Sequence, residues 1–170
     1  MPTLAEHACL VLITQGASHG WAVGSLLTSK AELGRVFTLS RPLTYRAIDG
    51  LVDLGLVRRK EGSGSTRDPA LLTPTAAGRR TATAWLDTPV HHMRDVRVEL
   101  LLKLLLRERG GMALQPLLNA QLEALPFEQL LHAGDDADLV AVWRREQARA
   151  VQQFLHSALA HEDQRREDHG

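Results

Sequence analysis

The chain has 170 residues, enough for one domain or for a small domain with an appendage. Twenty Lys and Arg residues balance twenty Asp and Glu, and 44% of residues are apolar, which is typical of a folded protein and excludes wholesale disorder. A single cysteine excludes an intramolecular disulfide framework. No charged-then-apolar leader opens the chain, and its most apolar run, Leu100–Leu106, is short and contains Lys103. We therefore expect a cytoplasmic protein, neither secreted nor membrane-spanning.

Charge is distributed unevenly along the chain. Residues 1–80 carry ten Lys and Arg against six Asp and Glu, whereas residues 135–170 carry five against eight. An N-terminal half with excess positive charge is suited to an anionic partner.

The first half of the sequence predicts three helices. Apolar residues at helical spacing indicate helices over Leu4–Ile13 and from Ser18, as N-cap, to Leu27. The alternating segment Arg35–Leu39 predicts a short strand. A third helix follows, with Ser40 as N-cap and Pro42 in its first turn, and stops at Gly55. The apolar side of this third helix is expected to hold Leu43, Ala47, Ile48, Leu51 and Leu54.

A hairpin is expected next. Leu56–Glu61 and Ala70–Thr73 are suited to extended structure, and residues 62–69 are rich in Gly and Ser and form a loop. Thr75 then caps a helix that runs to about Leu86. Helices followed by a hairpin with a flexible tip are typical of a winged helix-turn-helix, so we predict a mainly α fold with a small β-hairpin.

The rest of the chain favours long helices. We expect one over His92–Arg109, ended by Gly110 and Gly111, and one over Met112–Leu131 with a candidate break at Pro126. A last helix begins after the acidic residues Asp135–Asp138, which are favourable at a helix N-terminus.

Three regions follow from this reading. Residues 1–87 are predicted to form a winged-helix DNA-binding domain, residues 88–161 a C-terminal α-helical dimerisation region, and residues 162–170, which contain no apolar side chain, a disordered tail.

The third helix and the wing carry the predicted DNA contacts. The helix face opposite its apolar side presents basic and aromatic residues, and an Arg side chain is suited to guanine edges and phosphates. The wing is bracketed by basic residues that can follow a phosphate backbone. The alternative for each feature alone is a solvated surface. The residues that we predict to bind DNA are Ser40, Arg41, Thr44, Tyr45, Arg46, Lys60 and Arg67.

Several motifs, in this order, resemble the PadR-like transcriptional regulators. They are Cys9–Ile13 with Gly16–Trp21, then Ser40, Tyr45, Ile48, Leu51 and Gly55–Val57, then Leu72–Pro74 with Gly78, and finally Pro89, Val90 and Arg97–Lys103. The sequence departs from the family at Trp21, where Tyr is usual, and at Thr44, where Leu is common. The resemblance covers about residues 4–107. It implies a homodimer joined through C-terminal helices that represses transcription at a palindromic operator, with release by a small-molecule effector as a further expectation.

The last helix supports dimerisation independently, because its apolar stripe repeats at about 3.5 residues and needs a partner helix. The predicted dimerisation residues are Leu139, Trp143, Val151, Phe154 and Leu155. Trp85 and Trp143 are candidates for stacking on an effector, although core or interface packing is the commoner role of Trp.

Other classes of function remain as alternatives. An enzyme is disfavoured because the sequence has no nucleophile elbow, phosphate loop or Cys-x-x-Cys motif, so we predict no catalytic residues and no cofactor. A metal- or redox-responsive regulator would use Cys9 or the histidines. The side chains of the adjacent His91 and His92 point in different directions on a helix, and Cys9 lies in an apolar segment where a thiol is usually buried. No metal site is therefore predicted. A winged helix that only binds protein is the remaining alternative.

Overall fold

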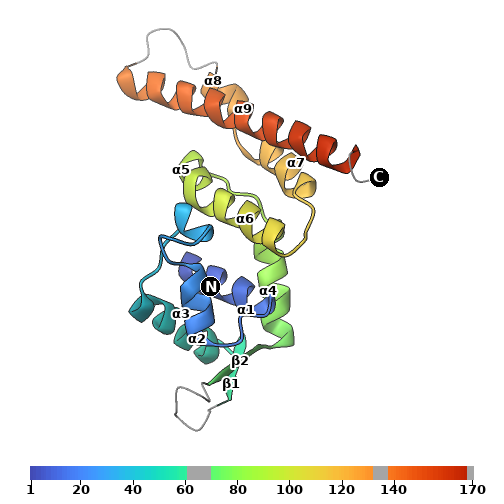
Figure 1. The fold of residues 1–170 in the computed structure, drawn as a ribbon. Coiled ribbons are helices and arrows are strands. Elements are labelled where there is room, and N and C mark those ends of the chain that lie inside the picture. Colours follow the sequence, from blue (N-terminus) through green and yellow to red (C-terminus); the bar gives the residue numbers. More distant parts are fainter. Residues whose placement is uncertain (61–69, 132–137, 168–170) are drawn as a thin grey trace.

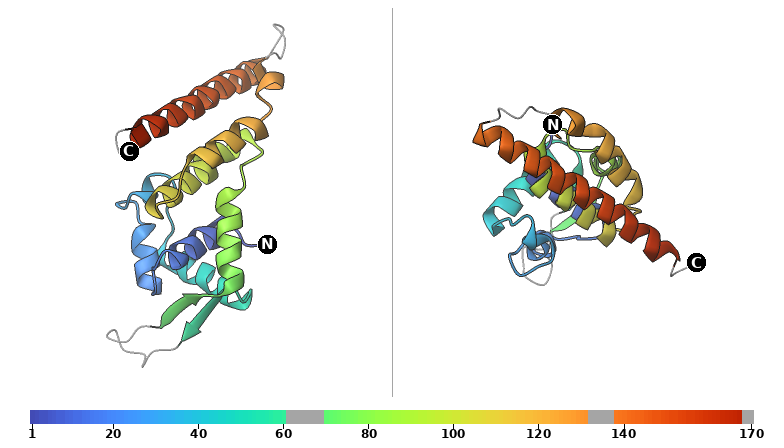
Figure 2. Two further views of the ribbon diagram at one scale, coloured as in Figure 1. Left: turned by 90° about the vertical axis from the view of Figure 1, so that its right-hand side faces the viewer. Right: turned by 90° about the horizontal axis from the view of Figure 1, so that it is seen from above.

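A computed structural model describes residues 1–60, 70–131 and 138–167 of the chain. The elements are stacked along one long direction, with the β-hairpin at one end and the longest helix, α9 (Leu139–Glu167), at the other (Figure 1). Two further views show the same order, with the intervening helices between these ends (Figure 2).

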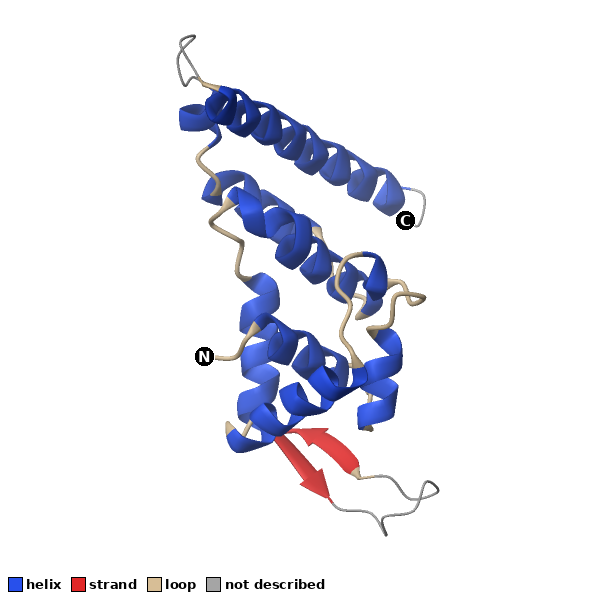
Figure 3. Cartoon of the chain, turned by 90° about the vertical axis from the view of Figure 1, so that its left-hand side faces the viewer, coloured by secondary structure: helices blue, strands red, loops and turns tan. Residues whose placement is uncertain are grey.

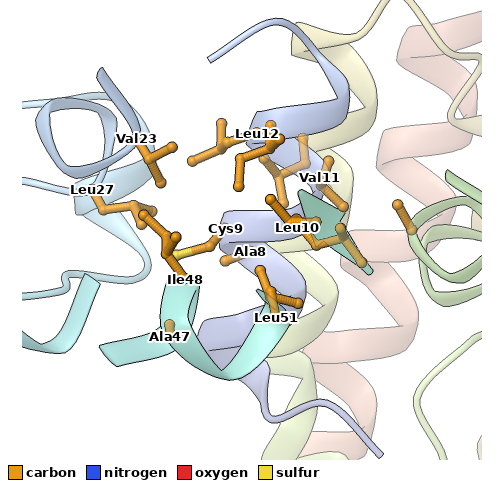
Figure 4. Packing of buried hydrophobic residues seen from close by; sticks show 14 of the residues in the cluster. Ala8, Cys9, Leu10, Val11, Leu12, Val23, Leu27, Ala47, Ile48 and Leu51 are labelled. Carbon is orange, nitrogen blue, oxygen red and sulfur yellow. The ribbon is translucent and has the colours of Figure 1, made fainter. Parts of the chain in front are cut away.

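Helix α1 (Leu4–Thr14) lies at the centre of the N-terminal half. Thr3 and Glu6 form a capping box at its start: the Thr3 backbone N–H donates to the Glu6 carboxylate at 2.6 Å, and the Glu6 N–H donates to the Thr3 hydroxyl at 3.3 Å. All six residues from Ala8 to Ile13 are buried, as expected for a helix that is apolar on every side. The other N-terminal elements pack around this helix (Figure 4).

The segment between the first and third helices differs from the prediction. Helix α2 (Gly20–Leu26) has His19 as its N-cap, not Ser18. A single 3₁₀ turn, η1 (Leu33–Arg35), occupies the start of the predicted strand 35–39. No strand forms there in the described part of the chain, because this backbone has no neighbouring strand to pair with. Its Leu39 N–H instead makes one isolated hydrogen bond to the Leu27 carbonyl oxygen, at 3.0 Å.

Helix α3 (Arg41–Asp53) and a two-stranded antiparallel sheet complete the winged-helix half. Gly55 leaves the helix with φ of +67°, a left-handed conformation that favours glycine, and turns the chain into β1 (Val57–Lys60). Strand β2 (Leu71–Pro74) pairs with β1, with Arg59 opposite Leu72. The two strands project from one end of the helices (Figure 3).

Helix α4 (Ala76–Asp87) follows the sheet and is capped as predicted, because the Thr75 hydroxyl accepts the Gly78 N–H at 3.0 Å. After a short loop, α5 (Met93–Asp95), the π-helical segment η2 (Val96–Leu100) and α6 (Leu101–Arg109) form one continuous helix. Leu102 and Leu106 of α6 join the core around α1, whereas Leu100 and Leu104 join a second core. This helix therefore connects the two halves of the molecule.

Helices α7 (Gln115–Ala124), α8 (Phe127–Leu131) and α9 build the second core with it. The predicted break at Pro126 is confirmed by the gap between α7 and α8. The predicted tail from residue 162 is wrong as far as residue 167, since α9 continues to Glu167. The Arg165 guanidinium lies 2.9 Å from the Glu108 carboxylate, and Gln115 donates to Asp163 at 3.0 Å, so polar contacts hold this last part of the helix.

The element order confirms a mainly α fold with a winged helix-turn-helix half and a helical C-terminal half. Across residues 1–60, 70–131 and 138–167, no helix has the length and the apolar character needed to cross a membrane.

Candidate nucleic-acid interface

The orientation of α3 is set by the residues that it buries. Ala47, Ile48 and Leu51 pack towards α1 and the N-terminal core (Figure 4). The opposite face of the helix is left in solvent. Arg41, Tyr45 and Arg46 are exposed on it, as the sequence predicted, and Asp49 is exposed beside them.

Two details of α3 were predicted wrongly. Thr44 is fully buried, and its hydroxyl donates to the Ser40 carbonyl oxygen at 3.1 Å, so it has no surface to offer DNA. Leu43 and Leu54, assigned to the buried side, are about half exposed. Ser40 is the exposed N-cap residue, but its hydroxyl makes no capping hydrogen bond.

Tyr45 packs against the start of α2. A Cβ atom at Gly20 would lie 2.6 Å from Cε1 of the Tyr45 ring, so the ring rests where a side chain at this position would push it aside. Next to it, the Trp21 indole is 67% exposed. A surface hollow of about 260 Å³ lies between these rings and the hairpin, and its lining includes His19 and Arg59. Two aromatic rings thus accompany the basic side chains on this surface.

The hairpin is fixed beside α3 by polar contacts. The backbone N–H of Leu72 donates to the Ser18 carbonyl oxygen at 2.7 Å, and His19 Nδ1 lies 3.2 Å from the Ala70 carbonyl oxygen, as its donor. On β1, Arg59 forms an ion pair with Asp49 of α3 at 2.5 Å. The hairpin is therefore tied to the start of α2 by two contacts and to α3 by one.

Arg58 and Lys60 alternate with Arg59 along β1 and are exposed. Neither has an ion-pair partner among the described residues. Their side chains point to the other side of the strand from Arg59, which faces α3. Arg67, also predicted to bind DNA, lies outside the described residues. We call the set of exposed residues Trp21 of α2, Arg41, Tyr45 and Arg46 of α3, and Arg58 and Lys60 of β1 the basic face.

Sequence reasoning missed two participants. Trp21 was not among the predicted DNA-binding residues, although its place directly after His19 and Gly20 puts it in α2, whose first residue contacts the Tyr45 ring. The pairing of Asp49 with Arg59 has no sequence signal, because the two residues come from different elements.

The two candidate effector residues line separate cavities. Trp85 borders a cavity of about 600 Å³, and Trp143 borders another of about 380 Å³. Trp85 is nearly buried and stacks on His7, with ring centroids 4.9 Å apart and 12° between planes. Trp143 is 65% exposed on α9.

The predicted dimerisation residues divide between two sides of α9. Leu139, Trp143 and Phe154 are exposed, whereas Val151 is half-buried against the second core. Leu155 is fully buried within this chain, so the prediction that it faces a second subunit is wrong. Its position, one residue beyond the exposed stripe, turns it inward.

Cys9 and the histidines show no arrangement suited to a metal ion. The described residues contain no group of three or more His, Cys, Asp or Glu side chains placed to hold one. Cys9 is buried in the core, and burial raises the pKa of its thiol to about 12, which keeps it protonated.

Three packed helices, an antiparallel hairpin and the outward side of α3 define a winged helix-turn-helix protein. No protein-family model matches the chain, and no curated protein matches it. Among solved structures, the chain is similar to Bacillus subtilis PadR in complex with operator DNA, at 20% identity over 94% of this chain and 99% of that chain, with a TM-score of 0.49.

The complex of Bacillus subtilis PadR with p-coumaric acid is 21% identical over 95% of this chain and 99% of that chain, with a TM-score of 0.45. The Vibrio cholerae virulence activator AphA is 19% identical over 94% of each chain, with a TM-score of 0.42. One of these similar structures, Bacillus subtilis PadR, shares its name with the family that the sequence motifs resemble.

Proposed function

We propose that this protein is a DNA-binding transcriptional regulator of the PadR-like type, which acts as a homodimeric repressor at a palindromic operator. The observation that carries this proposal is the basic face: Arg41 and Arg46 are exposed on α3, and Arg58 and Lys60 are exposed on β1 of the hairpin that α3 contacts through Asp49 and Arg59. The buried side of α3 fixes this orientation, so the helix can enter a major groove without rearrangement of the core.

The parts of the basic face would have different tasks. Arg41 and Arg46 occupy the first two turns of α3, the part of a recognition helix that meets base edges, and their guanidinium groups suit guanine or phosphate oxygens. Arg58 and Lys60 on the wing would contact phosphates, which contribute affinity without sequence information. The rings of Tyr45 and Trp21 would pack against the sugar-phosphate backbone between them.

Dimerisation is supported by α9. Its outer side exposes Leu139, Trp143 and Phe154, large apolar groups that a soluble chain normally covers. A second copy of the chain is the commonest cover, and a two-fold arrangement would place two α3 helices about 34 Å apart, one turn of duplex. Since the hairpin lies at the opposite end from α9, a dimer joined there leaves both basic faces free (Figure 1).

Release by a small molecule is the last part of the proposal. Bacillus subtilis PadR has been solved in complex with p-coumaric acid, a small organic acid, as well as with operator DNA. The present chain has cavities of a size suited to such molecules, the larger of about 600 Å³.

Fluorescence anisotropy with DNA from upstream of the protein's own coding sequence tests the proposal over a series of salt concentrations. A regulator that uses the basic face should bind with a steep salt dependence. Arg41→Ala and Arg46→Ala should each weaken binding and, where the side chain contacts phosphate, lower the salt slope by about one.

Arg109→Ala is the matched control, because Arg109 is an exposed arginine at the end of α6, away from the basic face. Equal effects of all three substitutions would contradict the proposed face. Absence of binding at low salt would contradict the function itself and favour a winged helix that binds only protein.

A further inference from the structure

One cavity of the described chain lies where the two halves of the molecule meet. Its volume is about 600 Å³, within the range of small-molecule sites. One wall is the N-terminal end of α1, another is the second half of α4 with the loop 88–92, and the third is the helix from Asp95 to Lys103. Leu4, Ala84 and Val90 supply apolar lining.

A buried ionic network forms the floor of this cavity. The Lys103 side chain is only 1% exposed, and its ammonium donates to Glu99 Oε1 at 2.7 Å and to the Thr88 carbonyl oxygen at 2.8 Å. Trp85 Nε1–H donates to the same Glu99 oxygen at 3.1 Å. The ammonium also lies 4.9 Å from the centroid of the Trp85 ring. The positive charge is therefore enclosed and already neutralised.

The faces of Trp85 are engaged as well. His7 stacks on this ring, and Lys103 lies over it, so the indole presents little surface for stacking on a ligand. The sequence-based suggestion of an effector stacked on Trp85 does not fit this geometry. Any ligand must take its polar contacts elsewhere in the cavity.

The groups in this cavity that remain available to a ligand are carboxylate oxygens, which accept hydrogen bonds. Glu99 lies within η2, where the wider π-helical turn is a feature common at functional sites, and its carboxylate is 31% exposed. In the described part of the chain, Glu99 Oε2 makes no hydrogen bond. Asp95, one turn earlier, lines the same cavity, and its only ion pair among the described residues is a long one to Arg94, at 3.8 Å.

We propose that this cavity binds a small organic cation, a primary amine attached to an apolar group the size of one ring. Its ammonium would donate to the open oxygens of Asp95 and Glu99, and its apolar part would lie against Leu4, Ala84 and Val90. The lining also includes Met1 and the imidazoles of His7, His91 and His92. Among its charged side chains, Asp95 and Glu99 present open carboxylate oxygens whereas the Lys103 ammonium is enclosed, so a ligand cation finds acceptors there that an anion of the same shape would not use. The role of such a cation as an effector rests on the proposed function, whereas its binding does not.

Isothermal titration calorimetry of the full chain, without DNA, tests the proposal. The probes are phenethylamine and 3-phenylpropanoate, which have similar shape and opposite charge. We expect phenethylamine to bind and 3-phenylpropanoate not to bind. Asp95→Asn should weaken phenethylamine binding about tenfold, as loss of a charge-assisted contact does.

Two further variants keep the result interpretable. Ala84 is exposed at the cavity wall, so Ala84→Phe should fill the space without disturbing a core and abolish binding. Glu123→Gln makes the same loss of charge on the exposed side of α7 and should leave binding unchanged. The proposal would be overturned if 3-phenylpropanoate binds or if phenethylamine does not. It would also be overturned if phenethylamine still binds to both the Asp95→Asn and the Ala84→Phe variants. None of these outcomes depends on DNA, so failure here is distinct from failure of the proposed regulator.

Discussion

Gly78 lies in the first turn of α4, where this helix passes against the backbone that connects α3 to β1. A Cβ atom at this position would lie 2.0 Å from the Leu56 carbonyl oxygen and 3.0 Å from its carbon. That oxygen also accepts the Thr75 N–H at 2.9 Å, so it cannot retreat freely. Close contact of α4 with the root of the wing therefore requires glycine.

Gly78→Ala should lower the free energy of unfolding by about 2 kcal/mol or more, because helix and hairpin must separate to admit a methyl group. Urea denaturation at fixed protein concentration measures this. Gly24→Ala is the matched control: there the new Cβ would meet Thr44 at an ordinary 3.7 Å, and alanine in a helix should be neutral or stabilising. Similar losses in both variants would show that the contact at Gly78 is not the cause.

His7 gives the protein a pH dependence at the residue scale. Burial against Trp85 is the largest influence and lowers the pKa of His7 below its usual 6.5, although the Thr3 carbonyl oxygen 3.1 Å from Nδ1 acts in the opposite direction. Between the folded-state pKa and 6.5 the unfolded chain binds more protons, so stability rises with pH there and is lost as the pH falls below 6.5.

His7→Phe should therefore flatten the acid side of the stability profile while it preserves a ring on Trp85. The change in slope should be a fraction of the roughly 1.4 kcal/mol per pH unit that one full proton gives, because His7 is only half-buried. Denaturation from pH 7 downward measures it. His156→Phe, at an exposed histidine of α9, should keep the wild-type slope. If it flattens the profile equally, the assignment to His7 fails.

At the scale of elements, periodicity predicted the helices and the hairpin well because each buries a regular set of side chains. It failed where a polar contact replaces an apolar one. Thr44 takes the buried position in α3 because its hydroxyl is satisfied by Ser40, so hydropathy alone assigned the neighbouring Leu43 instead. The last turns of α9 persist through partners such as Glu108, which is distant in sequence.

The short segment 35–39 failed for a related reason. Alternation predicts a strand only if another strand is available to pair with it, and the one sheet of the described residues contains β1 and β2 alone. The candidate site was predictable where it lies on one element, as for Arg41 and Arg46. The contact between Asp49 and Arg59 joins two elements and required the fold.

That contact predicts how α3 and the wing share charge. Asp49 neutralises Arg59 in the free protein, so Asp49→Asn should release a guanidinium to phosphate and remove a repulsive carboxylate. Affinity for DNA of random sequence should rise, with a salt slope steeper by about one. Stability should change little, because an exposed ion pair contributes at most about 1 kcal/mol.

Asp53→Asn controls for the charge change, since Asp53 is exposed one turn further along α3 and forms no ion pair within the described chain. Anisotropy with non-operator DNA at several salt concentrations distinguishes the two. An equal gain for both variants would mean that net charge, and not the release of Arg59, sets non-specific affinity.

At the scale of the whole molecule, α6 holds the two ends together. Its leucines enter both cores, and its buried Arg107 donates to the Leu86 carbonyl oxygen, to Asp87 at 2.6 Å and to the Ala113 carbonyl oxygen. The hairpin and α9 thus lie at opposite ends of one packed unit (Figure 2). A subunit contact at α9 would fix the spacing of two basic faces without touching either.

The double substitution Trp143→Glu and Phe154→Glu tests that arrangement. Both side chains are exposed on α9, so the monomer should keep its helical circular dichroism, whereas two carboxylates in each copy of an apolar contact should prevent association. Light scattering after size exclusion should then give the mass of one chain where the wild type gives two.

Operator affinity should fall to that of a single half-site. Gln153→Glu, an exposed change on the same helix, should leave the dimer intact. A dimer that survives the double substitution would move the subunit contact away from α9, and the spacing of the basic faces would then have to be set by another surface.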